Sequence, residues 1–278
     1  MKVDFHLHSS FSDGTFTPEE IAAQAAKIGM RHYIVTDHDN VDARSRGIEL
    51  AVEPGDGMDQ FHLLGLGIDP ENAALKSFLR SILDGRKARN VKMLANFARI
   101  GIEIPESEII AYAHGEVLAR PHFARYLMDK GVCESVSEAF DKFLMKTSPR
   151  ETRCFEERYQ PSASDAINAV HEAGGIAVMA HPRYWNFAWK DVGVDYAEVE
   201  RRLPPLIEQG LDGLECLYAA NTPEMNVEFS RMADRLKLLK SAGSDFHGAN
   251  KPHIKLGMEV SESFIAPLLE RLDQKVES

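Results

Sequence analysis

Short apolar runs alternate with amphipathic stretches along much of the chain, and this alternation predicts its elements. Six runs have the length and composition of β-strands, at residues 2–7, 32–36, 60–67, 176–180, 213–217 and 238–242. Stretches with apolar positions three and four residues apart predict helices, which begin at Pro18 and near residues 163, 195, 223 and 262. Thr17 is suited to cap the first helix and Gly29 to end it. This alternation favours an α/β fold with parallel strands.

The middle of the chain differs from both flanks because strand signals are scarce there. Helical periodicity covers residues 72–100, several short helical patterns follow in 105–145, and 146–161 is polar and irregular. We interpret residues 78–160 as a helical insertion that covers the mouth of a barrel built from the two flanking segments.

Composition narrows the classes of function. The chain has 278 residues, of which 44% are hydrophobic, and a formal net charge of −11. This length and hydrophobic content suffice for one large barrel or two ordinary domains and exclude a disordered chain. The acidic balance argues against a long electropositive groove for duplex nucleic acid. It is compatible with a small anionic substrate, because bound divalent ions add positive charge that residue counts omit.

Cysteine usage and hydropathy bear on the compartment. The three cysteines, Cys133, Cys154 and Cys216, are odd in number and not spaced as in a metal knuckle, which fits free thiols in a reducing cytoplasm. The first residues lack the basic and apolar regions of an export signal, and no run approaches the ~18 apolar residues of a membrane span. We therefore expect a cytoplasmic protein without membrane contact. The oligomeric state is not decided by the sequence.

Chemistry-bearing residues gather next to the apolar runs. The first run ends in His6-Leu7-His8, and because side chains alternate along a strand, both imidazoles face the same side. Comparable motifs recur beside other short apolar runs. We predict that nine of these side chains bind metal: His6, His8, Asp13, His38, Glu49, His62, His181, Asp245 and His247. Ligands at the ends of several strands are typical of barrel enzymes.

Each of these residues also has an ordinary structural interpretation. A lone histidine near a strand end is more often packed than a ligand, and on that ground four histidines stay unassigned: His32, His114, His171 and His253. Asp4 is either a plain strand-end carboxylate or a group that orients a ligand imidazole, and Asp37 and Asp39 are candidates for turn formation. The joint occurrence of six short motifs is what favours a metal site.

The predicted ligand set points to hydrolysis. Imidazole and carboxylate ligands suit zinc, manganese and iron. Nine ligands are enough for two or three divalent ions, and a glutamate such as Glu49 can bridge two of them. Such a cluster lowers the pKa of a bound water and stabilises charge that develops on phosphoryl oxygens. The pattern therefore suits attack on a phosphoester by a metal-bridging hydroxide.

Taken together, the motifs resemble those of the PHP (polymerase and histidinol phosphatase) superfamily along nearly the whole chain. The matching segments are residues 6–8 with 12–14, then 36–39, 47–49, 62–65, 180–182 and 243–247. The resemblance implies a distorted (β/α)7 TIM-like barrel formed by residues 1–77 and 161–278. It also implies phosphoester hydrolysis at a site for two or three ions of manganese, iron or zinc.

A narrower likeness concerns residues 120–127 and 139–144. They resemble the inserted helical region of bacterial nucleotide-directed members, which act as nucleoside 3′,5′-bisphosphate or AMP phosphatases and whose close relatives trim RNA from the 5′ end. The implied partner is a small phosphorylated substrate, in particular a nucleotide. The likeness implies three metal positions, held by His6, His8, Glu49 and Asp245, by Asp13, His38 and His247, and by Glu49, His62 and His181.

Candidate substrate contacts follow from the same likeness. Arg120 and His122 are candidates for gripping a phosphate, because the guanidinium fork matches phosphate oxygens, although a surface ion pair is an alternative for Arg120. His122 is also a candidate proton donor to the leaving group, which makes Arg120, His122 and Asp245 the predicted catalytic set. Arg183 and Tyr184 are candidate substrate contacts, and Tyr184 either stacks on a base or packs in the protein.

One segment departs from the family pattern. Only residues 40–46 separate the Thr-Asp-His-Asp motif from the Gly-x-Glu motif, too few for the helix and strand that relatives place there. We expect a direct connection, and Glu53, Asp56 and Asp59 are the alternatives if Glu49 cannot reach the site. Two rival functions stay open: a phosphatase of another small phosphomonoester such as histidinol phosphate, and a non-catalytic metal-binding PHP module.

Overall fold

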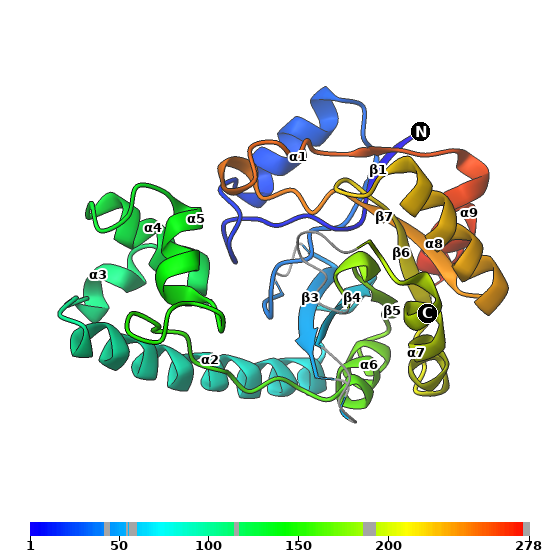
Figure 1. Ribbon diagram of the computed structural model, residues 1–278. Coiled ribbons are helices and arrows are strands. Elements are labelled where there is room, and N and C mark those ends of the chain that lie inside the picture. The colour runs from blue at the N-terminus through cyan, green and yellow to red at the C-terminus, as the bar shows by residue number, and fades with distance from the viewer. Residues whose placement is uncertain (42–44, 54, 56–59, 114–116, 186–192, 275–278) are drawn as a thin grey trace.

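Two sheets lie at the centre of the molecule, with helices around them and a further group of helices to one side (Figure 1). The computed structural model describes residues 1–41, 45–53, 55, 60–113, 117–185 and 193–274. Within these residues the fold is a mixed α/β fold, as the alternation of patterns predicts. Among the same residues, none of the helices is both long and apolar enough to cross a membrane.

The strands form one sheet of three and one of five. The smaller sheet has the order β2-β1-β8, with bounds His32–Tyr33, Lys2–Asp4 and Met258–Glu259. The larger sheet has the order β3-β4-β5-β6-β7, with bounds Gly47–Val52, Phe61–Leu66, Ile176–Met179, Gly213–Tyr218 and Leu239–Gly243. Each strand predicted from an apolar run is present, although β1 and β2 are shorter than their runs.

The expectation of parallel strands is correct only in part. β1 with β2, and β5 with β6 and β7, are parallel, whereas β3 with β4, β4 with β5, and β1 with β8 are antiparallel. For β3 and β4 the reason is the connection, which runs only from residue 53 to residue 60. A link of that length is too short for the crossover that parallel neighbours require.

Backbone hydrogen bonds join the two sheets at both sides. The segment after β1 bonds to β7 through Phe5 N and Ala242 O at 3.0 Å, and to the segment after β7 through His6 O and Asp245 N at 2.7 Å. The segment after β2 pairs with β3 through a parallel bridge between His38 and Glu49. The strand ends that carry the histidine motifs are therefore brought next to one another.

Helices cover the sheets as the amphipathic patterns predict. α1 (Pro18–Lys27) begins at Thr17, whose side chain accepts a hydrogen bond from Glu20 N, and is followed by Gly29 with φ +71°. α6 (Ala163–Glu172), α7 (Tyr196–Glu208) and α8 (Pro223–Leu236) pack on β3 to β6 in one apolar cluster. α9 (Glu262–Gln274) packs in a second cluster with β1, β4 and β5.

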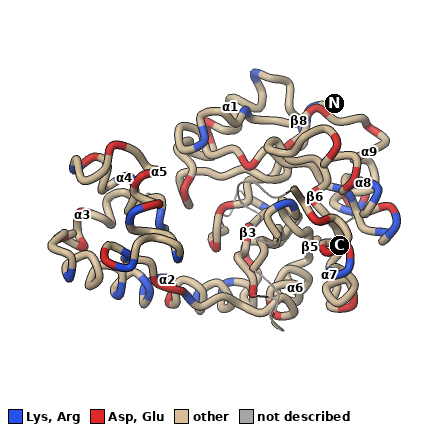
Figure 2. The backbone as a smooth tube through the Cα atoms, viewed as in Figure 1, with Lys and Arg blue, Asp and Glu red and all other residues tan. Residues whose placement is uncertain are grey.

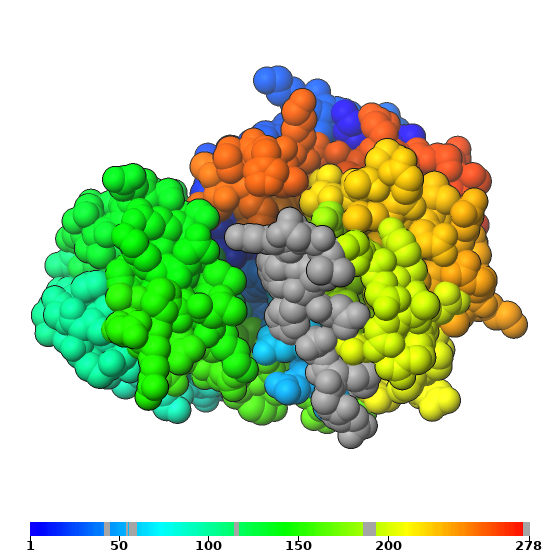
Figure 3. Space-filling view, in the orientation of Figure 1, coloured from blue at the N-terminus to red at the C-terminus, as the bar shows by residue number. Residues whose placement is uncertain are grey.

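The middle segment has a hydrophobic core of its own. α2 (Ala73–Arg99) is a long helix that leads away from the sheets toward α3 (Glu106–Ile110), α4 (Arg120–Asp129), α5 (Val136–Ala139) and a π-helical turn at Phe140–Leu144 (Figure 1). The rings of Phe97 and Phe123 stack there with centroids 6.1 Å apart, beside Phe143. This core is distinct from those of the sheets, and the space-filling view shows a hollow between the two parts (Figure 3).

Candidate metal centre

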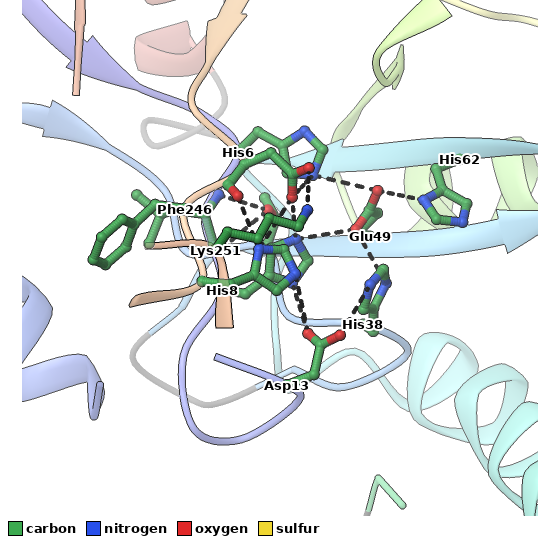
Figure 4. Close-up of polar contacts among 12 residues, drawn as sticks. His6, His8, Asp13, His38, Glu49, His62, Phe246 and Lys251 are labelled. Atoms are coloured by element: carbon green, nitrogen blue, oxygen red, sulfur yellow. Dashed lines mark hydrogen bonds and ion pairs between the residues drawn. The ribbon is translucent and has the colours of Figure 1, made fainter. Parts of the chain in front are cut away.

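The strand ends bring together all nine side chains predicted to bind metal. They form four overlapping groups whose ligand atoms lie within 4.8 Å of one another. The groups are His8, Asp13, His38 and His247; His6, Glu49 and His181; His6, His8 and Asp245; and His38, Glu49 and His62. Residues at opposite ends of the chain thus share one centre, to which β3, β4 and the segments after β1, β2, β5 and β7 contribute (Figure 4).

Glu49 on β3 is the middle of this cluster. Its carboxylate is buried, with a side chain 1% exposed. Its two oxygens lie 2.7 to 3.3 Å from nitrogens of five imidazoles, those of His6, His8, His38, His62 and His181. The short connection before β3 therefore does not keep Glu49 from the site. Glu53 lies farther along the chain and lines the adjacent cavity, and the other two alternatives, Asp56 and Asp59, lie outside the described residues.

Two aspartates flank Glu49. Asp245 Oδ1 is 3.4 Å from His8 Nε2 and 3.6 Å from His6 Nε2. Asp13 lies on the other side, with Oδ1 3.3 Å from His247 Nε2. Carboxylate and imidazole atoms in such proximity can converge on shared cations.

Three atoms of the cluster are buried without a hydrogen-bond partner: His6 Nε2, His8 Nε2 and Glu49 Oε2. Buried polar atoms in folded proteins are nearly always satisfied, so such atoms require an explanation. All three are atoms that ligate divalent metals, and the mixture of imidazole and carboxylate suits manganese, iron and zinc. The residues present therefore fit a metal centre.

The electrostatics of the cluster keep its acids ionised. Burial by itself disfavours the charged carboxylate, but the imidazoles of His38 and His62 hold the pKa of Glu49 well below its usual range. Burial likewise opposes the charge of Asp245, and Lys251 and His247 hold its pKa well below its usual range. Burial lowers the pKa of His38 to about 3. The carboxylates and His38 are thus in the deprotonated forms that metals bind.

The sequence analysis missed a fourth acid at the site, Glu215 on β6. Its side chain is fully buried, its Oε1 lies 3.0 Å from His6 Nδ1, and it accepts a hydrogen bond from the His181 backbone N–H at 2.6 Å. A partner on the second ring nitrogen fixes the orientation of a ligand histidine. The sequence signal that could have identified Glu215 is its position as a single acid in an otherwise apolar strand. Tyr218 and Lys251 were also missed, and both donate to Asp245 Oδ2, at 2.8 and 2.6 Å.

Buried aspartates hold the loops that carry the cluster. Asp4 accepts hydrogen bonds from Ser244 N, Ser244 Oγ and Gly257 N, so it fixes the strand-end loop rather than an imidazole. Asp37 accepts from Ser9 N and from the hydroxyls of Ser9 and Ser12. Both side chains therefore act on the backbone around the ligands.

The backbone at the site is strained at ligand positions. His181 has φ +27° and Asp245 has φ +58°, a region that residues with a Cβ rarely occupy and that concentrates at functional sites. Gly243 allows β7 to approach β1, because a Cβ there would collide with His6 Cβ and Glu215 Oε1. The positive φ values and the close approach at Gly243 follow from the short distances between the strand ends.

The candidate substrate residues lie in two places. Arg120 lines a cavity of about 410 Å³ beside Asp13, His38 and His62. His122 is buried and its Nδ1 accepts a hydrogen bond from Ala119 N at 3.0 Å. Its roles in phosphate binding and in protonation of the leaving group stay predictions.

The second place is next to His181. Arg183 donates to Ala220 O and lies over the Tyr184 ring, 5.1 Å from its centroid. The Tyr184 ring is 5.4 Å from that of His181.

The unassigned histidines lie outside the cluster where they are described. His171 Nε2 is 2.7 Å from Asp212 Oδ2, and His32 is exposed on β2. His253 is also exposed, and His114 lies outside the described residues. Asp39 is buried in ion pairs with Arg86 and Arg158.

A mixed α/β fold whose strand ends gather imidazoles around a buried bridging acid is typical of metal-dependent hydrolases. A family profile described as the PHP domain matches residues 4–208. This match covers more than half of the chain, and the protein therefore belongs to the PHP domain family. The resemblance noted from the motifs is confirmed.

Characterised relatives of this chain are phosphoester hydrolases. It is 33% identical over 259 residues to a 3′,5′-nucleoside bisphosphate phosphatase of Chromobacterium violaceum, covering 88% of this chain and 87% of the relative. It is 26% identical over 275 residues to the 5′-3′ exoribonuclease Rnm of Escherichia coli, covering 92% and 88%. It is 28% identical to a phosphoribosyl 1,2-cyclic phosphate 1,2-diphosphodiesterase of Eggerthella lenta, covering 90% and 97%.

Solved structures show the same fold. An amidohydrolase from Chromobacterium violaceum, described with bound sulfate and no metal, matches with a TM-score of 0.81 and 29% identity over 99% of this chain and 97% of that one. A protein of Bifidobacterium adolescentis assigned as a metal-dependent phosphoesterase matches with a TM-score of 0.79 and 28% identity, over 97% and 96%. The chain is thus a metal-dependent phosphoesterase of the PHP family, and the predicted enzyme class is confirmed.

Proposed function

We propose that this protein hydrolyses a phosphomonoester of a nucleotide, such as a nucleoside 3′,5′-bisphosphate, a 5′-AMP-like molecule or the 5′ end of a short RNA. The observation that carries the proposal is Glu49, one buried carboxylate within 3.3 Å of five imidazoles. The names of the bisphosphatase and exoribonuclease relatives support a nucleotide substrate. The net charge of −11 favours a small substrate over duplex DNA, and the cysteine usage supports a cytoplasmic protein.

In this proposal the nine clustered residues hold two or three ions of manganese, iron or zinc. When bound, the ions would lower the pKa of a water and stabilise negative charge on phosphoryl oxygens. Glu49 would contribute to holding two of the ions, because each of its oxygens faces an imidazole from a different part of the chain. Glu215 would keep His6 oriented, and Tyr218 would keep Asp245 oriented.

The chain's own side chains would also contact the substrate. Arg120 lines the cavity next to the cluster and would donate to phosphate oxygens. Arg183 and Tyr184 would contact the substrate on the side of His181. His122 would give a proton to the leaving group, or would position the loop of Ala119, to which it is hydrogen-bonded.

We also propose that strands β1 to β7 of the two sheets close into a distorted (β/α)7 barrel formed by residues 1–77 and 161–278. The support is the hydrogen bonding of the segment after β1 with β7 and the residues that follow β7, on one side, and the bridge between the segment after β2 and β3 on the other. Residues 78–160 would be the helical insertion over its mouth. The support is the separate core around Phe97 and Phe123.

A phosphate-release screen tests the proposed function. The purified protein is supplied in turn with manganese, zinc and iron and offered nucleoside bisphosphates, nucleoside monophosphates, a 5′-phosphorylated dinucleotide and histidinol phosphate. We expect the highest kcat/KM on a nucleotide and loss of turnover in His8→Ala. The matched control is His32→Ala, which removes an exposed imidazole outside the cluster.

Two outcomes would replace the proposal by its rivals. Preference for histidinol phosphate or another non-nucleotide ester would indicate a different small-molecule phosphatase. Full metal occupancy by elemental analysis without turnover of any ester would indicate a non-catalytic metal-binding module.

A further inference from the structure

One lysine side chain reaches into the metal centre. Lys and Arg recur along helices such as α2 (Figure 2), whereas Lys251 lies in the segment after β7. Its Nζ donates a hydrogen bond to Asp245 Oδ2 at 2.6 Å. Figure 4 shows its side chain pointing toward the same centre as His8 and Glu49. A positive charge therefore stands beside residues that are predicted to hold cations.

Asp245 differs from the other acids of the metal centre because its partners include a Lys ammonium. The ion-pair partners of Glu49, Asp13 and Glu215 are histidines. Among the residues that the structure describes, Lys251 is the single Lys or Arg that pairs with an acid of this centre. The ammonium thus cancels part of the negative charge that attracts a divalent ion to Asp245.

The two oxygens of Asp245 face different partners. Oδ2 accepts hydrogen bonds from Lys251 Nζ at 2.6 Å and from the Tyr218 hydroxyl at 2.8 Å. Oδ1 lies 3.4 Å from His8 Nε2 and 3.6 Å from His6 Nε2, two ring nitrogens that are buried without a hydrogen-bond partner. Two donors match the two lone-pair sites of Oδ2. An ion held by His6 and His8 therefore finds only Oδ1 available.

The backbone next to Lys251 is tied to the loop that carries Asp13. Asn250 Nδ2 donates to Asp13 O at 2.6 Å, and Ala249 N donates to Thr15 Oγ1 at 2.8 Å. These contacts fix the base of a side chain that would otherwise lose much conformational entropy when it forms an ion pair. The Lys251 side chain is 36% exposed, so its charge is only partly screened by solvent.

The charge of Lys251 and the orientation of Asp245 have opposite effects on a bound ion. An ordered carboxylate is a better ligand, whereas a like charge a few ångströms away repels a divalent ion. The Tyr218 hydroxyl donates to the same oxygen without adding charge, so it retains the orientation when the lysine charge is lost. Repulsion is therefore the larger contribution of Lys251.

We propose that Lys251 is a positioning residue that limits Asp245 to one metal-binding oxygen and lowers the affinity of the position formed by His6, His8 and Asp245 for its ion. The inference rests on the proposed function, in which these residues hold metal, and concerns the regulation of the same site. Lys251 thereby raises the metal concentration that is needed to load the enzyme fully.

The test measures manganese binding in Lys251→Gln, which removes the charge and keeps a hydrogen-bond donor. The protein is stripped with a chelator and titrated with manganese, and free manganese is followed by electron paramagnetic resonance. We expect one manganese Kd to fall about tenfold or more, because a like charge is removed at short range. Damage to the fold would weaken metal binding, so this gain of affinity distinguishes the proposed role from a merely structural one.

Lys255→Gln is the matched control, because it removes an exposed lysine from the same segment and should leave every manganese Kd unchanged. Lys251→Arg keeps the charge and should retain the affinity of the parent. Tyr218→Phe removes a neutral donor from the same oxygen and should not raise the affinity. An unchanged or higher Kd in Lys251→Gln, with a melting temperature near that of the parent, would overturn the proposal.

Crystals grown at limiting manganese identify the position that gains affinity. In Lys251→Gln the anomalous peak beside His6, His8 and Asp245 should gain occupancy relative to the parent. In the parent, Asp245 should contact the ion through Oδ1 alone, with Lys251 still on Oδ2. A gain at another position, or an ion bound by both oxygens of Asp245 in the parent, would overturn the proposal.

The inference and the proposed function fail separately. Manganese affinity that depends on Lys251, without turnover of any ester, would refute the proposed function and retain the role of Lys251. Turnover of nucleotides with equal manganese affinities in the parent and in Lys251→Gln would do the reverse.

Discussion

At one end of the cavity three carboxylates and six imidazoles face one another. The other end is lined by four guanidinium groups, those of Arg86, Arg89, Arg120 and Arg158 (the arginine cluster), of which Arg86 and Arg158 pair with one carboxylate, that of Asp39. The metal centre has an excess of groups that bind cations, and the arginine cluster has an excess of groups that bind anions. The difference teaches that the net charge of a chain does not describe its cavities, because an acidic chain places a basic lining beside its candidate metal ligands.

The largest expected effect is at the metal centre. Glu49→Gln removes the charge shared by five imidazoles, and we expect kcat to fall by roughly a thousandfold or more together with a loss of bound metal. The measurements are phosphate release and elemental analysis. Glu53→Gln, on the same wall of the cavity, should cost less than about tenfold. A larger loss in Glu53→Gln than in Glu49→Gln would contradict the assignment of the central acid.

The next effect concerns the support of the ligands. Glu215→Gln weakens the contact to His6 Nδ1, and loss of such outer partners typically costs about 10- to 100-fold in metal affinity or activity. The measurement is metal affinity by competition with a chelator. Glu208→Gln, an exposed acid at the end of α7, should leave this affinity as it is. Equal metal affinities in the two variants would contradict a supporting role for Glu215 at His6.

The pH dependence of metal affinity tests the protonation state of the metal centre. Burial by itself lowers the pKa of His8, but the nearby carboxylates of Asp245 and Glu49 raise it to about 9. His8 is therefore protonated at neutral pH without metal, and a metal must displace that proton. We expect the affinity for manganese to rise as the pH increases toward 9, with proton release detected by calorimetry in two buffers. Metal binding without proton release at pH 7 would be inconsistent with this assignment.

The smallest effect is competition by a simple anion. Inorganic sulfate should raise KM for a nucleoside bisphosphate a few-fold more than it raises KM for the monophosphate, because it competes for the arginine cluster as well as for the metal centre. Sodium chloride at equal ionic strength is the control for general screening. The difference should disappear in Arg89→Gln, and its persistence there would place the sulfate elsewhere.

Much of the metal centre could be predicted from the sequence, because its ligands follow apolar strands directly. His6 and His8 end the first run, and Asp245 and His247 follow the last run, so a fold that aligns strand ends must bring them together. Glu49 lies in the predicted cluster in spite of the short preceding segment, because β3 pairs directly with the segment that carries His38. Helix starts such as Thr17-Pro18 were predictable from local capping chemistry.

Other features depend on contacts that no local pattern records. The antiparallel pairing of β3 with β4 follows from the length of their connection rather than from their apolar runs. Glu215 stands in an apolar strand, and its role appears only when His6 lies beside it. The carboxylate of Asp39 joins Arg86 of α2 to Arg158, which follows the helical segment. The charge balance of the arginine cluster is therefore a property of the folded chain.

Anomalous diffraction at the manganese edge, from crystals grown with manganese, tests the central claim most directly. The account predicts at least two anomalous peaks within ligand distance of the cluster, with Glu49 in contact with more than one of them. Absence of any peak next to Glu49, with ions bound only at surface carboxylates, would contradict it.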